Sequence, residues 1–174
     1  MEQNRLDADK IIGVGITVPG NVDKKHLMQE ISPQLNVKKV SFLSLPKELR
    51  IPVYLEKEAN AATLAELKLG IAKGMKNLVY IYLTQGVGAG MVMGGELYTG
   101  AHNRAGEIGH QTIIPKGKRC NCGKLGCWEM YISEEELLSM YRKKREGRDT
   151  SLKDFFNHLS YADEKALSVW EEYL

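Results

Sequence analysis

Short apolar runs in the first half of the chain predict β-strands. Residues 11–18 form one such run, which ends at Pro19-Gly20, and residues 21–23 continue that turn. Similar runs over residues 53–56 and 78–83 predict two further strands. Their length is typical of buried strands rather than of helices.

Helical patterns separate these strands. Residues 59–69 are rich in Ala, Leu and Glu with their apolar positions on one face, and Gly70 can end that helix. Residues 46–50 predict a short helix with proline in its first turn, whereas residues 24–45 are polar and irregular and predict only short elements. Strands and helices in alternation indicate an α/β layered fold.

A glycine-rich segment follows the strand predicted at 78–83. Residues 91–93 and 96–98 flank Gly94-Gly95 and predict a hairpin. Before it lie three glycines whose backbone N–H groups could bind a phosphate: Gly86, Gly88 and Gly90. A hairpin rather than a helix follows and no Walker lysine is present, so a tight turn without a ligand is an equal alternative.

The last 42 residues predict helices. Ser133 with Glu136 predicts a capping box, and Ser151 with Asp154 resembles one. The helix predicted over 133–145 has glutamates in its first turn and arginines and lysines in its last, which complements the helix dipole. This basic run is therefore interpreted as structural, with DNA contact as the alternative.

Composition narrows the class of protein. The 174 residues include 24 Lys and Arg against 22 Asp and Glu, and a net charge of +2 argues against a nucleic-acid-binding arm. With 43% hydrophobic and 26% charged residues, the chain resembles an average globular domain. No apolar run is long enough for a bilayer and the first ten residues are polar, so we expect a cytoplasmic protein without a membrane partner.

One histidine and three cysteines are the strongest chemical signal. His110, Cys120, Cys122 and Cys127 provide four N/S ligands, the set that structural zinc prefers, and all four positions are then filled, with none for a catalytic water. Free or redox-active thiols are the alternative. A zinc ion would also order residues 111–119 between the ligands.

Two groups of polar residues are candidates for ligand contact. Glu107 and Glu129 flank the zinc ligands, so an ordered loop would hold two carboxylates that suit sugar hydroxyls. The less favoured alternative is that both are ordinary surface glutamates. Glu58 and Asn60 lie where a strand meets a helix, a usual place for site residues in α/β sheets, although either could simply cap the helix.

Together these motifs resemble the ROK family, which groups sugar kinases with transcriptional repressors. The resemblance rests on Val18-Pro19-Gly20, Glu58-Ala59-Asn60-Ala61-Ala62, the glycines of 86–90, Gly106-Glu107-Ile108-Gly109-His110 and the cysteine run at 120–129. It implies the α/β actin-like (ribonuclease H-like) ATPase fold with two lobes around a cleft, here incomplete. Residues 1–70 would belong to the small lobe and residues 71–174 to the large lobe.

The resemblance also implies roles for individual residues. His110, Cys120, Cys122 and Cys127 would be the zinc ligands, and the monosaccharide would contact Gly20, Glu58, Asn60, Glu107, His110 and Glu129. In a kinase of this family the residue at position 58 is an aspartate that deprotonates the sugar hydroxyl, and an asparagine precedes it. Here Lys57-Glu58 replaces that pair, and Thr84-Gln85 stands where kinases tend to have Gly-Thr.

These departures favour the family's xylose-repressor-like regulators. We expect a zinc-stabilised, sugar-sensing core of a repressor of carbohydrate metabolism, which would reach DNA only through a segment outside this chain and would form a homo-oligomer when intact. The alternative is an ATP- and Mg-dependent sugar kinase with Glu58 as its catalytic base. A third possibility is a fragment that binds zinc without responding to sugar.

Overall fold

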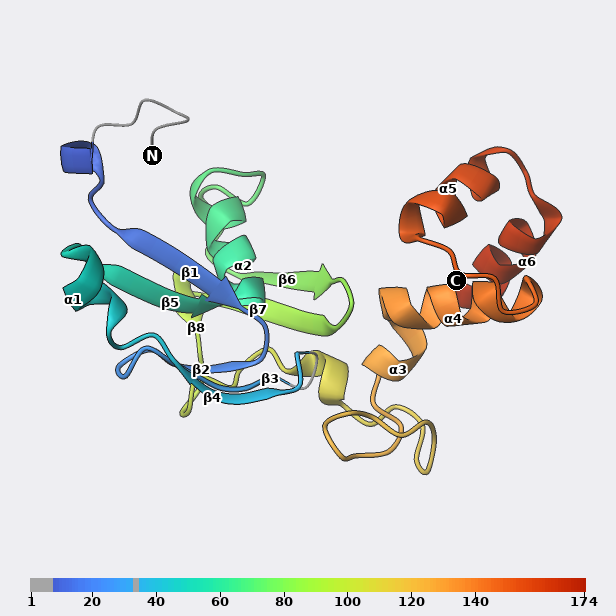
Figure 1. Ribbon diagram of the computed structural model, residues 1–174, viewed down its shortest axis with the longest axis horizontal. Coiled ribbons are helices and arrows are strands. Elements are labelled where there is room, and N and C mark those ends of the chain that lie inside the picture. The colour runs from blue at the N-terminus through green and yellow to red at the C-terminus, as the bar shows by residue number, and fades with distance from the viewer. Residues whose placement is uncertain (1–7, 33–34) are drawn as a thin grey trace. The chain divides into compact units, whose positions relative to one another are not determined.

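A computed structural model describes residues 8–32 and 35–174, so most of the polar N-terminus lies outside the described residues. The chain forms two compact units (Figure 1). The first combines Met1–Tyr82 with Ala89–Gly106, and the second combines Leu83–Gly88 with Glu107–Leu174. The lobe boundary at residue 70 stays a prediction. None of the helices in the described part is both long and apolar enough to cross a membrane.

The first unit contains a parallel pair of strands, β1 (Val14–Val18) and β5 (Val53–Lys57). Its ladder runs from Val14 opposite Val53 to Val18 opposite Lys57. Pro52 precedes β5 and has no N–H to donate, while its carbonyl accepts the hydrogen bond of Val14 N at 2.8 Å. The first strand therefore begins three residues later than its apolar run predicts.

An antiparallel sheet follows, formed by β2 (Asn21–Asp23), β3 (Met28–Ser32) and β4 (Val37–Ser41). The prediction that residues 21–23 continue a turn is wrong, and the polar segment after it contains two strands. Their buried positions include polar side chains: Gln29 is 3% exposed, and its Nε2 donates to the carbonyl of Pro19 at 2.8 Å. A strand buried through polar residues lacks the alternation that sequence reading depends on.

Helices α1 (Leu45–Leu49) and α2 (Glu58–Lys68) match the predicted types, and so do strands β6 (Leu78–Leu83) and β8 (Glu96–Tyr98). Strand β7 (Val87–Met93) begins four residues earlier than predicted, so residues 87–90 are extended where a turn or a phosphate-binding loop was expected. The 3-10 turn η2 (Ala8–Lys10) was not predicted. The hairpin around Gly94-Gly95 is confirmed, with Met91 opposite Tyr98. Strand β7 passes very close to α2, because a Cβ at Gly90 would lie 1.9 Å from Thr63 Oγ1.

The second unit is helical after the cysteine-rich loop. It contains the 3-10 turn η3 (Ile108–His110) and helices α3 (Glu129–Ile132), α4 (Glu134–Lys144), α5 (Leu152–Ser160) and α6 (Glu164–Tyr173). Tyr141 and Phe155 are fully buried at its centre, with ring centroids 4.9 Å apart in an edge-to-face arrangement. The helical tail predicted from the sequence is confirmed.

Of the two predicted capping boxes, the one at Ser151 is complete and the one at Ser133 is only half formed. At Ser151 both halves are present, since Ser151 Oγ accepts from Asp154 N and the Asp154 carboxylate accepts from Ser151 N. At Ser133 only the first half forms, because the Glu136 carboxylate pairs with Lys118 instead. The N–H of Ser133 bonds to the carbonyl of Glu129, so this N-terminus needs no reciprocal cap.

Candidate functional site

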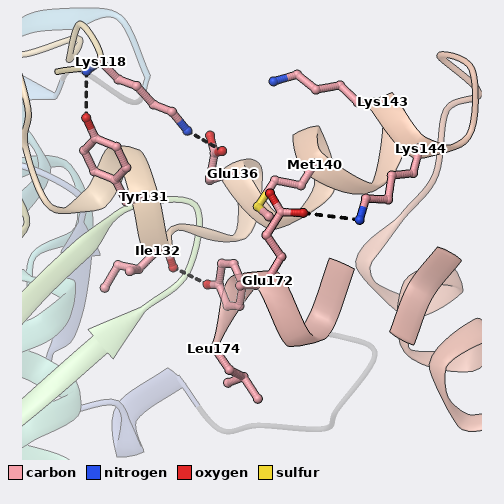
Figure 2. A pocket seen from close by; sticks show the side chains of 10 residues that line it. Lys118, Tyr131, Ile132, Glu136, Met140, Lys143, Lys144, Glu172 and Leu174 are labelled. Carbon is pink, nitrogen blue, oxygen red and sulfur yellow. Dashed lines mark hydrogen bonds and ion pairs between the residues drawn. The ribbon is translucent and has the colours of Figure 1, made fainter. Parts of the chain in front are cut away.

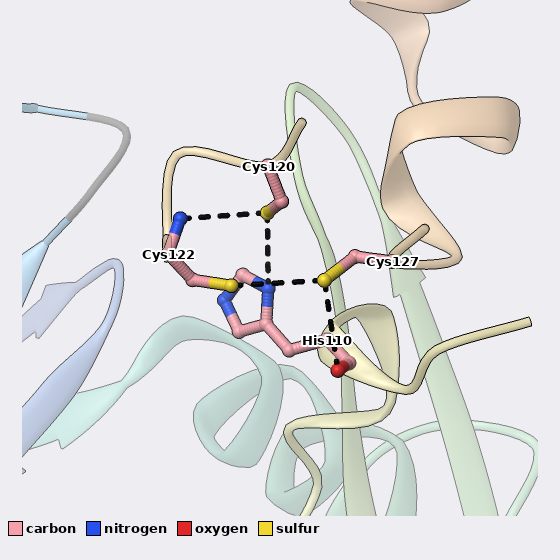
Figure 3. Close-up of side chains that lie close together, drawn as sticks. All are labelled: His110, Cys120, Cys122 and Cys127. Atoms are coloured by element: carbon pink, nitrogen blue, oxygen red, sulfur yellow. Dashed lines mark hydrogen bonds between the residues drawn. The ribbon is translucent and has the colours of Figure 1, made fainter. Parts of the chain in front are cut away.

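The cysteine-rich loop brings the four predicted metal ligands together. One ligand atom from each of His110, Cys120, Cys122 and Cys127 lies within 4.8 Å of all the others. Figure 3 shows the three sulfurs around the imidazole ring, with Cys122 Sγ 3.6 Å from Cys127 Sγ and Cys120 Sγ 3.7 Å from His110 Nδ1. The arrangement joins the end of η3 to a loop that starts ten residues later in the chain.

Backbone hydrogen bonds fold this loop without a hydrophobic core of its own. Cys120 N donates to the carbonyl of Lys124 at 2.9 Å, and Gly126 N donates to that of Lys118 at 2.8 Å. Gly126 has a φ of +75°, and a Cβ there would lie 1.7 Å from the carbonyl oxygen of Ile114, so only glycine fits. The side chains of residues 111–116 are exposed, and few apolar contacts therefore order this part of the loop.

The donor set fits a thiophilic cation. Burial raises the pKa of the Cys120 and Cys127 thiols. Burial also acts to raise the pKa of Cys122, but a hydrogen bond from Lys124 N–H and those from the other two thiols lower it. The three clustered thiols can all be deprotonated to thiolates only if a positive charge compensates their negative charges. A divalent metal, bound by the thiolates and the imidazole, supplies that charge.

Glu129 lies directly against this cluster. Its Oε1 is 3.1 Å from His110 Nδ1 and 2.9 Å from Cys120 Sγ, and both side chains of the ion pair are largely buried. The hydrogen bond to Glu129 is the main cause that raises the pKa of His110. Burial alone would raise the pKa of Glu129, but the hydrogen bonds from His110 and Cys120 outweigh it and the pKa is lowered. Glu129 is thus an ionised, fixed carboxylate.

Glu107 is held at the other end of the same segment. It is the N-cap residue of η3, and its carbonyl accepts from His110 N at 3.2 Å. The structure therefore places Glu107, His110 and Glu129 in the second unit. His110 and Glu129 both lie close to Cys120. Their predicted contact with sugar stays a prediction.

The predicted residues Glu58 and Asn60 lie in the first unit, at the start of α2. Burial raises the pKa of Glu58. Asn60 is 2% exposed, and its Nδ2 donates to Glu56 Oε1 at 2.9 Å. This bond gives Asn60 a local structural role beside the predicted sugar contact.

Glu56 is a residue that the sequence reading missed. Its carboxylate accepts hydrogen bonds from Asn60, from Lys57 N at 3.0 Å and from the ammonium of Lys24, which belongs to the turn between β2 and β3. A carboxylate four residues before an asparagine at a predicted helix start was the available signal. Its ion pair with Lys24 had none, because 32 residues separate the two in sequence.

Two of the predicted glycines, Gly20 and Gly90, are closely packed, since a Cβ at Gly20 would lie 2.1 Å from the carbonyl oxygen of Ile31 and one at Gly90 would lie 1.9 Å from Thr63 Oγ1. Gly20 lies between β1 and β2, Gly86 lies in the turn between β6 and β7, and Gly88 and Gly90 are part of β7 itself. Phosphate binding by these three later glycines stays a prediction.

A cavity of about 570 Å³ lies elsewhere in the second unit (Figure 2). Its walls come from α3, α4, the end of α6 and Lys118. Lys118 pairs with Glu136, and Lys144 lies 3.3 Å from Glu172, so two of the three lysines are already neutralised. Lys143 makes no ion pair within the described ranges.

Comparison with known proteins identifies the class. The model of the ROK family matches residues 1–174, and the chain belongs to this family. Its structural neighbours are ROK sugar kinases and regulators, which have the actin-like ATPase fold. The expected family and fold are thereby confirmed.

The relatives include both functional branches. The xylose repressor of Bacillus subtilis is 36% identical over 84% of this chain and 38% of its own length, and a glucokinase of Streptomyces coelicolor is 34% identical over 78% and 43%. The crystal structure of a ROK glucokinase from Streptomyces griseus with glucose and AMPPNP aligns with a TM-score of 0.84, at 27% identity over 94% of this chain and 58% of that one. A ROK transcriptional regulator, a homologue of E. coli Mlc, aligns with a TM-score of 0.77, at 30% identity over 92% and 43%. The chain thus spans about 40% of the length of these curated relatives.

Proposed function

We propose that this chain is the sugar-sensing, zinc-stabilised core of a ROK transcriptional regulator of carbohydrate metabolism. The observation that carries the sugar site is the position of the Glu129 carboxylate, which is mostly buried beside the metal cluster with its Oε1 3.1 Å from His110 Nδ1. An acceptor that is already immobilised loses little entropy when it binds a sugar hydroxyl.

Zinc would be held by His110, Cys120, Cys122 and Cys127, and it would supply positive charge that keeps the thiolates ionised. The protein residues provide the recognition. Glu129 and Glu107 would accept hydrogen bonds from sugar hydroxyls, and His110 would hold the metal with one ring nitrogen and meet the sugar with the other. Gly20, Glu58 and Asn60 would complete the sugar contacts.

The regulator is favoured over the kinase by the residues at the start of α2. Glu58 is longer by one methylene than the aspartate of ROK kinases, and a displacement of about 1 Å can reduce a rate roughly 100-fold. Binding tolerates such a shift better than proton transfer does. In the whole protein, sugar would shift an equilibrium between two states and so control DNA binding by a segment outside these residues.

One observation favours the kinase alternative. Burial raises the pKa of Glu58, which is the direction that makes a carboxylate a stronger general base. In that case ATP and Mg²⁺ would be the cosubstrates, and Gly86, Gly88 and Gly90 would approach the phosphates. We further propose that the whole protein is a cytoplasmic homo-oligomer.

The test measures binding and catalysis with the same protein. Zinc-loaded protein is titrated calorimetrically with pentoses, hexoses and amino sugars, and ATP consumption is followed with each sugar that binds. We expect binding without sugar-dependent ATP consumption. Consumption abolished by Glu58→Gln would establish the kinase instead, and no binding to any sugar would leave only the zinc-binding fragment.

A pair of variants tests the role of Glu129. Glu129→Gln removes the charge of the acceptor and should weaken sugar binding while zinc stoichiometry stays near one per chain. Glu171→Gln, at an exposed position on α6, is the matched control and should change neither quantity. Equal sugar affinity in both variants would remove Glu129 from the site.

A further inference from the structure

Lys57 is a lysine that the fold buries. It is the last residue of β5 and is only 5% exposed. Its Nζ donates a hydrogen bond to the carbonyl oxygen of Ala105 at 3.1 Å, across 48 residues of sequence and within the first unit. A buried ammonium is costly unless its donors are satisfied, and the carbonyl of Ala105 is one of the groups that satisfy them.

The partner of Lys57 belongs to a segment tied down at both ends. Ala105 N donates to the carbonyl of Thr99 at 3.0 Å, and the carbonyl of the next residue, Gly106, accepts from Ala89 N at 2.8 Å. The chain then continues directly into Glu107. Lys57 therefore bonds to the backbone two residues before one predicted sugar contact.

The other side of Lys57 is fixed as well. Its backbone N–H donates to Glu56 Oε1 at 3.0 Å, and it is the N-cap residue of α2, whose first residue is Glu58. The start of α2 and the segment of residues 99–106 are thus joined through one side chain. Each of these two backbone segments leads within two residues to a predicted sugar carboxylate.

We propose that Lys57 is a positioning residue for sugar binding, which links the backbone at Glu58 to the backbone that leads into Glu107. This inference rests on the proposed function. Without the ammonium, the carbonyl of Ala105 loses this donor and residues 99–106 gain freedom. Sugar binding must then order these residues again. The conformational entropy lost in doing so makes the binding free energy less favourable and lowers the affinity.

Local hydrogen exchange reports on the link without any sugar. The amide protons of Ala105 and Ala89 are bonded to carbonyls of this segment, so their exchange measures its opening. In Lys57→Met we expect both amides to exchange at least tenfold faster, while the amide of Val14 in β1 keeps its rate. A purely global loss of stability would accelerate all three equally.

Sugar affinity is measured on the same variants. We expect Lys57→Met to bind the sugar about tenfold more weakly, equivalent to about 1.4 kcal/mol, and Lys57→Arg, which retains a cationic donor, to recover part of the loss. Lys25→Met removes an exposed lysine of the turn after β2 and is the control, with unchanged exchange and affinity.

The hydrogen-exchange and sugar-affinity measurements distinguish failure of the proposed function from failure of the positioning role. If the wild-type protein binds no sugar, the proposed function fails and positioning for sugar fails with it, while the exchange arm still establishes whether the link to Ala105 exists. If sugar binds but Lys57→Met retains wild-type affinity, the positioning role is overturned and the proposed function stands. Should Lys57→Met not fold, Lys57→Arg and Lys57→Gln are compared in its place, and equal affinity and exchange in these two would overturn the proposal.

Discussion

Removal of one cysteine ligand is the most direct test of the metal centre. Cys122 is the suitable ligand, because it is only partly buried whereas Cys120 and Cys127 are 2% and 0% exposed. Serine at position 122 therefore removes a thiolate without placing a new hydroxyl in a closed core. The consequences can be attributed to the metal.

The expected magnitude follows from the structure of the loop. Structural zinc sites with four ligands contribute roughly 10–16 kcal/mol, so one ligand accounts for about 3 kcal/mol on a simple division, which is a loss of roughly 100-fold in zinc affinity. The exposed residues 111–116 have few apolar contacts to replace the metal. A loss of this size is a large fraction of the stability of a typical domain, which is about 5–15 kcal/mol.

The assay combines metal content with stability. Zinc affinity of Cys122→Ser is measured by competition with a chromophoric chelator, and unfolding in urea is followed by the fluorescence of tryptophan, including Trp128 next to the last cysteine. Asn121→Ser, an exposed neighbour in the same loop, is the control and should behave as wild type. Full zinc retention with unchanged stability in Cys122→Ser would refute the structural metal site.

Two further predictions concern the helical tail. Phe155→Ala should lower the free energy of unfolding by about 3–5 kcal/mol, since the ring is fully buried against Tyr141, and urea unfolding measures the loss. The hydrogen bonds from Ser151 lower the pKa of Asp154, so its stabilising contribution is present above the ordinary aspartate pKa and is lost as the pH falls through the lowered value. Asp154→Asn should therefore show a smaller loss of stability than wild type on acidification from about pH 5 to pH 2; identical acid profiles would contradict this role.

Short-range patterns were sufficient for much of this protein. The hairpin around Gly94-Gly95 and the helix capped by Ser151 were predicted because turn and cap signals lie within a few residues of each other. The four candidate metal ligands were predictable for a related reason, since thiols and imidazole at this spacing have few other common uses. The family followed from the order of these motifs.

The tertiary structure alone decided where polar groups find their partners. Gln29 can be buried because the carbonyl of Pro19 accepts its hydrogen bond. A polar residue at a buried position removed the apolar pattern by which β3 could have been predicted as a strand. Glu56 pairs with Lys24, which is 32 positions away in the sequence, and Lys57 bonds to Ala105, which is 48 positions away. Hydrophobic residues reveal burial by their own chemistry, whereas a polar residue can be buried only if a partner reaches it, and that partner is supplied by the folded chain.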